Sequence, residues 1–191
     1  MPAHRRHVFH ARVGLAAGTD RLVPLSELAH LDPAAHDAAL AKYDDTPERQ
    51  RLRDTVIPII GRRWTEVVFL SPVHPHAIWQ AWRELTGQEL APLPFWAIPV
   101  AALPTETVVF TRARSAVGDP IHPDEVTALD KGSFRTALQT TPENRDWLAS
   151  LAARGAKGAW FNGTPHVLAG GDVSLRDAQT ISWEEPFAAT L

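Results

Sequence analysis

The stretch Val67-Val68-Phe69-Leu70-Ser71-Pro72 is the part of the sequence that decides the fold. Four consecutive apolar residues, with β-branched and aromatic side chains among them, are typical of a buried strand. The serine and proline that follow favour a helix start, because serine can accept first-turn N–H groups and proline lacks the N–H that would be unpaired. We therefore expect a buried strand at residues 66–71 that runs directly into a helix ending at Gly87, which starts either at Ser71-Pro72 or at His74-Pro75.

The segments on either side of this stretch predict the remaining sheet. Upstream, His7-Val8-Phe9-His10-Ala11-Arg12-Val13 predicts a first strand. Downstream, the chain from Gly155 to Trp183 predicts a meander of short strands with turns at Asn162-Gly163 and Gly170-Gly171, since Asn-Gly favours a hairpin turn. The expected strands are residues 7–13, 66–71, 95–99, 107–112, 159–161, 166–169 and 181–183.

Helices are expected after prolines that follow a capping residue, as in Asp32-Pro33, Thr46-Pro47 and Thr141-Pro142. The second of these should end near residue 57, before Pro58, and the third at Gly155. Together the elements predict a single α+β domain over residues 1–191, with a mixed, mainly antiparallel and strongly bent sheet and flanking helices. Its core should include Val68, Leu70, Ile78, Trp82, Leu148 and Leu151, with Leu85 and Trp147 also facing inward.

Composition excludes several classes of function. The net charge is −3 and the pI about 6.3, so no overall field attracts nucleic acid or an anionic membrane. The chain has no cysteine, which excludes disulfides, thiolate metal sites and a cysteine nucleophile. Its apolar runs are too short to cross a bilayer, and none near the N-terminus has the length of a signal peptide. We expect a soluble, cytoplasmic protein without a membrane partner.

Polar side chains on the predicted strands are the candidates for chemistry. Alternation along the first strand places His10 and Arg12 on one face, where histidine can donate or accept and arginine can hold a phosphate. Alternatively, His10 is a core histidine and Arg12 forms a salt bridge at the rim. Ser71 can cap the following helix, contact an anion at the strand-to-helix junction, or do both. Glu184 follows the last strand and can stabilise an oxocarbenium-like state, or it is simply exposed beside Glu185.

Other catalytic motifs are missing from the sequence. It has no His-Glu-x-x-His, no Gly-x-Ser-x-Gly and no phosphate-binding Gly-rich motif. We therefore expect no metal cofactor and no serine hydrolase.

The order of these segments resembles the ADP-ribosyltransferase-like fold superfamily, with a distant similarity to rifampin ADP-ribosyltransferases. The resemblance rests on a histidine strand, a strand that ends in serine before a helix, a strand with an apolar-proline ending, and a final meander. The segments that carry it are Phe9-His10-Ala11-Arg12, Ala17-Gly18-Thr19, Leu22-Val23-Pro24, Val67–Ser71, Trp96-Ala97-Ile98-Pro99, Gly155–Trp160 and Val173–Ile181. The chain departs from the family pattern where a middle-strand tyrosine would fall near Ser71, and where Thr164-Pro165-His166 replaces a late glutamate.

The resemblance implies a pocket for NAD or another nucleotide lined by His10, Arg12 and Ser71. Its leading function is ADP-ribosyl transfer from NAD to a protein or nucleic-acid acceptor, or nucleotide binding by a catalytically degenerate relative. In a transferase, Arg12 would hold the pyrophosphate, His10 a ribose hydroxyl, and Glu184 or Asp172 would stabilise the reacting ribose.

Two other functions remain open from the sequence. One is a non-enzymatic module that binds protein or nucleic acid through surface tryptophans and the arginines of residues 49–63. The other is an RNA phosphate-processing enzyme on the same fold that uses His10 and Arg12.

Overall fold

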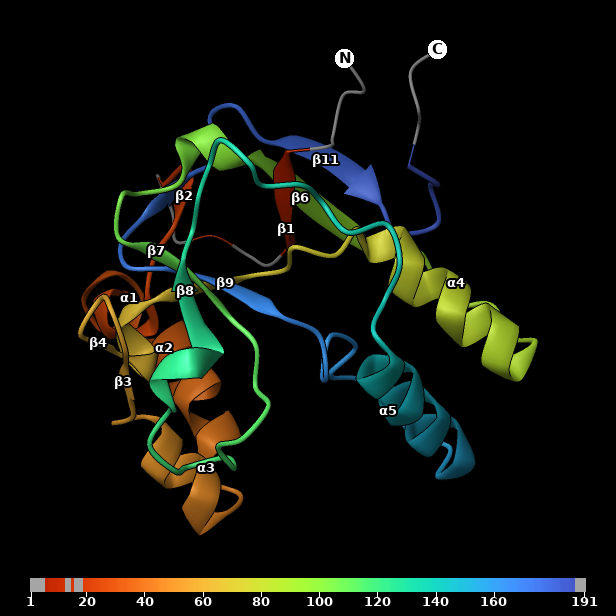
Figure 1. Cartoon of the computed structure of the whole chain (residues 1–191), viewed down its shortest axis with the longest axis horizontal. Coiled ribbons are helices and arrows are strands. Elements are labelled where there is room, and N and C mark those ends of the chain that lie inside the picture. The colour runs from red at the N-terminus through yellow and green to blue at the C-terminus, as the bar shows by residue number, and fades with distance from the viewer. Residues whose placement is uncertain (1–5, 13–14, 16–18, 188–191) are drawn as a thin grey trace.

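The computed structural model describes residues 6–12, 15 and 19–187, and it contains helices and strands in a mixed order (Figure 1). The helices are α1 (Leu25–Leu31), α2 (Pro33–Leu40), α3 (Pro47–Leu52), α4 (Pro75–Thr86) and α5 (Pro142–Ala153). The strands are β1 (His7–Ala11), β2 (Arg21–Leu22), β3 (Val56–Ile57), β4 (Arg62–Arg63), β5 (Val68–Leu70), β6 (Pro94–Pro99), β7 (Thr107–Phe110), β8 (Val126–Ala128), β9 (His166–Ala169), β10 (Val173–Ser174) and β11 (Gln179–Ser182).

The longer strands form two main sheets, which are connected by one pair of hydrogen-bonded residues. One sheet has the order β1-β6-β11 and the other β5-β9-β7-β8, and each ladder between these strands is antiparallel. Phe9 of β1 pairs with Ser71, just beyond β5, and joins the two sheets. Helices α1 to α3 lie on one side of this framework and α4 and α5 on the other (Figure 1). The expected α+β class and mainly antiparallel pairing are confirmed.

The starts of α2, α3, α4 and α5 follow the capping pattern of the sequence, whereas α1 begins after Pro24 without a side-chain cap. The side chains of Asp32, Thr46 and Thr141 accept backbone N–H groups of the first turns of α2, α3 and α5, and a proline follows each cap. Of the two starts that the sequence offers for α4, Ser71-Pro72 and His74-Pro75, the structure has the second, with His74 as the cap. It ends as predicted at Gly87, whose φ of 68° suits glycine. Helix α3 ends earlier than expected, at Leu52.

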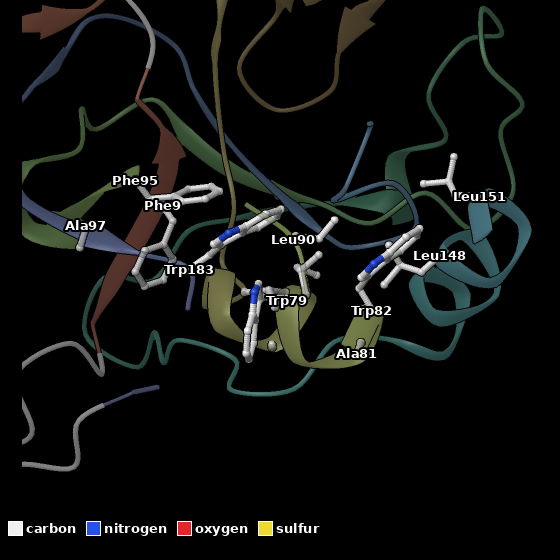
Figure 2. Close-up of a cluster of buried hydrophobic side chains, with 13 residues drawn as sticks. Phe9, Trp79, Ala81, Trp82, Leu90, Phe95, Ala97, Leu148, Leu151 and Trp183 are labelled. Carbon is white, nitrogen blue, oxygen red and sulfur yellow. The ribbon is translucent and has the colours of Figure 1, made fainter. Parts of the chain in front are cut away.

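Two hydrophobic clusters lie on opposite faces of the β1-β6-β11 sheet. Phe9, Phe95 and Ala97 pack with α4 and α5 on one face, and Figure 2 shows Trp82 of α4 beside Leu148 of α5. The cluster on the other face joins this sheet to β5 and includes Val8, Trp96, Ile98, Val68 and Leu70. The six residues predicted to form the core are buried, whereas Leu85 is 40% exposed and Trp147 is half-buried.

The hairpin expected at Asn162-Gly163 does not form. Residues 159–161 are not a strand, and of the two central turn residues only Gly163, not Asn162, has a positive φ, whereas a type I′ turn needs both. Asn144 of α5 donates from its amide nitrogen to the carbonyl oxygens of Trp160 at 2.8 Å and Asn162 at 2.7 Å. Because α5 binds these carbonyls, they do not enter a strand ladder. Trp160 and Val167, which such a hairpin would place next to each other, pack with different clusters.

The helices in these ranges are all too short or too polar to cross a membrane.

Candidate ligand-binding cavity

A cavity of about 470 Å³ lies between β5 and the helical segment α1 to α3. Small-molecule sites have volumes of roughly 300–1,000 Å³, so this cavity has the size of a ligand pocket. Leu22, Leu25, Leu28 and Val68 give it an apolar lining. The polar and aromatic side chains that line it are His10, Thr19, Arg21, Lys42, Tyr43, Arg49, Trp64, Thr65 and Phe69.

His10 lines this cavity, and its hydrogen bonding indicates which ring nitrogen is protonated. Its Nδ1 lies 2.7 Å from the carbonyl oxygen of Ala11. Because a carbonyl oxygen only accepts, Nδ1 carries the proton, and Nε2 of the neutral ring is an acceptor. Burial lowers the pKa of His10 below its ordinary value of 6.5, and the hydrogen bond to Ala11 offsets only part of that effect. The ring is therefore neutral at pH 7, with Nε2 in its acceptor form.

Three aromatic side chains form a fixed part of the cavity wall. The ring of Trp64 lies 4.6 Å from that of Phe69, and its Nε1 donates to the hydroxyl of Tyr43 at 3.3 Å. The guanidinium of Arg49 lies 5.7 Å from the centre of the Tyr43 ring. Packing and this hydrogen bond orient the indole before any ligand arrives. A planar aromatic ligand can stack against such a surface.

The charge of the lining is positive. Arg21, Lys42 and Arg49 line the cavity, and no carboxylate does, although every Asp and Glu of the sequence lies in the described ranges. Arg21 pairs with Asp172 at 2.7 Å and Arg49 with Asp45 at 2.6 Å. These two ion pairs offset part of the charge, and the remaining excess of cationic side chains in a concave surface favours an anion.

Arg12 shares a face with His10 but does not line the cavity. The His10 ring and the Arg12 guanidinium lie 6.2 Å and 5.7 Å from the ring of Trp96. Because both groups lie near the same ring, Arg12, which directly follows β1, is on the same face as His10, as the alternation predicted. However, Arg12 is exposed and does not belong to the residues that line the cavity. The lining residues nearest to it in the sequence are His10 and Leu15.

Ser71 lies on the opposite face from His10. Cross-strand partners point to the same face of a sheet, so the pairing of Phe9 with Ser71 places both on one side and His10 on the other. The Ser71 hydroxyl donates to the carbonyl of Val73 at 2.9 Å and accepts from its N–H at 3.0 Å. The expectation that His10, Arg12 and Ser71 line one pocket was wrong.

The two candidate carboxylates also lie outside the cavity. Glu184 is exposed, accepts from the Ser182 hydroxyl at 3.2 Å, and borders a separate depression over α4 with His76, Trp79 and Arg83. Asp172 does not line the cavity itself but forms an ion pair with Arg21, which does.

Lys42, Tyr43 and Trp64 line the cavity but were not among the candidates from the sequence. Tyr43 is the only tyrosine of the chain, which was the one available signal. What the sequence does not show is that residues 25–52 fold over β5.

Two features that favoured an interaction module look different in the structure. The five arginines of residues 49–63 each pair with a carboxylate: Arg49 with Asp45, Arg51 with Glu48, Arg53 with Asp44, Arg62 with Glu106 and Arg63 with Asp54. All seven tryptophans lie in the described ranges and are buried or half-buried. In the described ranges the basic stretch is therefore ion-paired within the chain, and no tryptophan is largely exposed.

Within the described ranges, no three His, Asp or Glu side chains are grouped as metal ligands. Comparison of the chain with protein-family models, with curated proteins and with solved structures gives no match.

Proposed function

We propose that this chain binds a nucleotide in the cavity around His10, with NAD as the first candidate. The observation that supports it most is the combination of an unprotonated His10 Nε2, an aromatic wall and a positive lining in one cavity of ligand size. The order of the segments, with a histidine strand first and β5 next to it, supports an ADP-ribosyltransferase-like origin.

Each part of a nucleotide has a matching group in the cavity. The base can stack on the wall that contains Tyr43 and Trp64. A ribose hydroxyl or an exocyclic amine can donate to Nε2 of His10. The phosphate is attracted by the cationic side chains.

The proposal is for binding by a catalytically degenerate relative rather than for transfer. Breaking the nicotinamide–ribose bond builds positive charge on the ribose, and a nearby carboxylate stabilises that charge. The two candidate carboxylates are engaged elsewhere, Glu184 over α4 and Asp172 with Arg21. We therefore expect NAD to bind without release of nicotinamide.

Isothermal titration with NAD and ADP-ribose tests this function. His10→Ala removes one neutral hydrogen bond and should weaken binding by about threefold to tenfold. Arg12→Gln is the matched control, because Arg12 lies directly after the same strand and outside the cavity, so this variant should bind like the wild type. Failure of the wild type to bind either ligand at millimolar concentration would end the nucleotide proposal. A loss with Arg12→Gln but not with His10→Ala would place the site elsewhere.

A further inference from the structure

Lys42 is the cation of the cavity that lacks a carboxylate partner. It lies in the short 3-10 helix Ala41–Tyr43, directly before the tyrosine of the aromatic wall. Arg21 and Arg49 each pair with a carboxylate. Lys42, in contrast, has no ion pair with any residue that the structure describes. Among the residues that the structure describes, none supplies a carboxylate that neutralises this charge.

The position of Lys42 fits an anionic group at the mouth of the cavity. Lys42 is exposed although it lines the cavity, so it stands where the cavity meets solvent. Tyr43 and Trp64 are half-buried, and burial is deep enough at His10 to lower its pKa. A ligand that enters this space therefore meets a positive charge at the mouth and aromatic rings inside.

We propose that Lys42 binds the 5′-phosphate of an adenine nucleotide while the base lies against the wall of Tyr43 and Trp64. This inference rests on the proposed function and adds the residue that selects a phosphorylated ligand over the bare nucleoside. The same chemistry is present in a free mononucleotide and in one half of a dinucleotide, and Lys42 is a binding residue in both cases.

The experiment compares AMP, adenosine and NAD by isothermal titration on the wild type and three variants. Lys42→Gln removes the charge, and Lys42→Arg keeps it. Lys157→Gln is the control, because Lys157 is an exposed lysine without an ion pair in the described ranges, near the end of α5 and outside the cavity. Circular dichroism of each variant verifies that it is folded.

The wild type should bind AMP about tenfold more tightly than adenosine, the difference made by a hydrogen bond between charged groups. Lys42→Gln should lose that preference without a change in adenosine affinity, and Lys42→Arg and Lys157→Gln should keep it. Higher ionic strength should weaken AMP binding to the wild type but not to Lys42→Gln. NAD tighter than AMP would identify the dinucleotide as the source of the phosphate, and AMP equal or tighter would identify the mononucleotide.

Three results would overturn the inference, and they separate it from the proposed function. Equal binding of adenosine and AMP by the wild type leaves a nucleoside site without a phosphate contact. A preference for AMP that survives in Lys42→Gln assigns the phosphate to another cation. Binding of none of the three ligands removes both the inference and the proposed function.

Discussion

Phe9 and Ser71 exchange both backbone hydrogen bonds, at 2.9 Å and 2.8 Å, and this one pair joins the two main sheets. The register of this pair also determines which face of the sheet the side chains around it take. Phe9 and Ser71 face α4 and α5, whereas the neighbouring His10 faces the cavity beneath α1 to α3. The candidate site is therefore made by His10 of β1, by residues 64–69 at β5 and by the helical segment that covers them.

The protonation of His10 should control binding. Burial lowers its pKa below 6.5, and only the neutral ring offers Nε2 as an acceptor. NAD affinity should stay constant from alkaline pH down to about 6.5 and decrease only at lower pH, as the ring becomes protonated. Titration of NAD across this range, with His10→Ala as the reference, checks the prediction. A decrease that begins above pH 6.5 would show that another group is responsible.

Trp82 should be a major contributor to stability. It is 3% exposed in the cluster between α4 and α5, and its ring lies 5.3 Å from that of Trp160. Trp82→Ala should lower the free energy of unfolding by about 3–5 kcal/mol in denaturant titrations. Leu85→Ala on the same helix removes a side chain that is 40% exposed and should change it by less than about 0.5 kcal/mol. A loss below about 1 kcal/mol for Trp82→Ala would contradict the packing described.

Asn144 should hold the turn that replaces the expected hairpin. Its side chain is fully buried, donates to two carbonyls and accepts from the Thr140 hydroxyl at 2.7 Å. Asn144→Ala should cost roughly 1–3 kcal/mol of unfolding free energy, since it leaves buried polar groups without partners. Asp146→Ala, an exposed position on the same helix, serves as the control. Equal stability of the two variants would show that the turn does not depend on α5.

Glu125 should stabilise the fold only when it is ionised. Burial alone would raise the pKa of this carboxyl, but hydrogen bonds from the Arg114 N–H, the Ser115 hydroxyl and the Ala113 N–H outweigh burial and hold the pKa well below 4.5. A lowered pKa in the folded state means that the stabilisation is complete above pH 4.5 and is lost as the pH falls below it.

Glu125→Gln should therefore reduce the free energy of unfolding by roughly 1.5–3 kcal/mol at pH 7. The difference from the wild type should shrink as the pH falls below 4.5, which unfolding curves at several pH values can measure. A difference in unfolding free energy that does not depend on pH would mean that the stabilisation does not come from the charge of Glu125.

Features that depend on neighbouring residues could be predicted from the sequence. The caps at Asp32, Thr46 and Thr141 and the end of α4 at Gly87 are local, because each is made within one turn of the chain. The buried stripe of Ile78 and Trp82 follows equally from helical periodicity.

Contacts between residues far apart in the sequence could not be predicted. The turn signal at Asn162-Gly163 was correct as a turn, but Asn144, eighteen residues earlier, binds the carbonyl of Asn162. The opposite faces of His10 and Ser71 depend on the register between β1 and the end of β5, which are about sixty residues apart. Lys42 and Tyr43 reach the cavity because α2 and α3 fold back over β5, and no local pattern encodes that.

The imidazole nitrogen spectrum of His10, followed while ADP-ribose is added, is the measurement that tests the central claim most directly. Long-range proton–nitrogen correlation identifies the protonated nitrogen, and His10→Ala assigns the signals. The free protein should show Nδ1 protonated and Nε2 unprotonated at pH 7. ADP-ribose should shift the Nε2 signal in a saturable way while the ring stays neutral. An Nε2 signal that does not move at millimolar ADP-ribose would contradict nucleotide binding in this cavity.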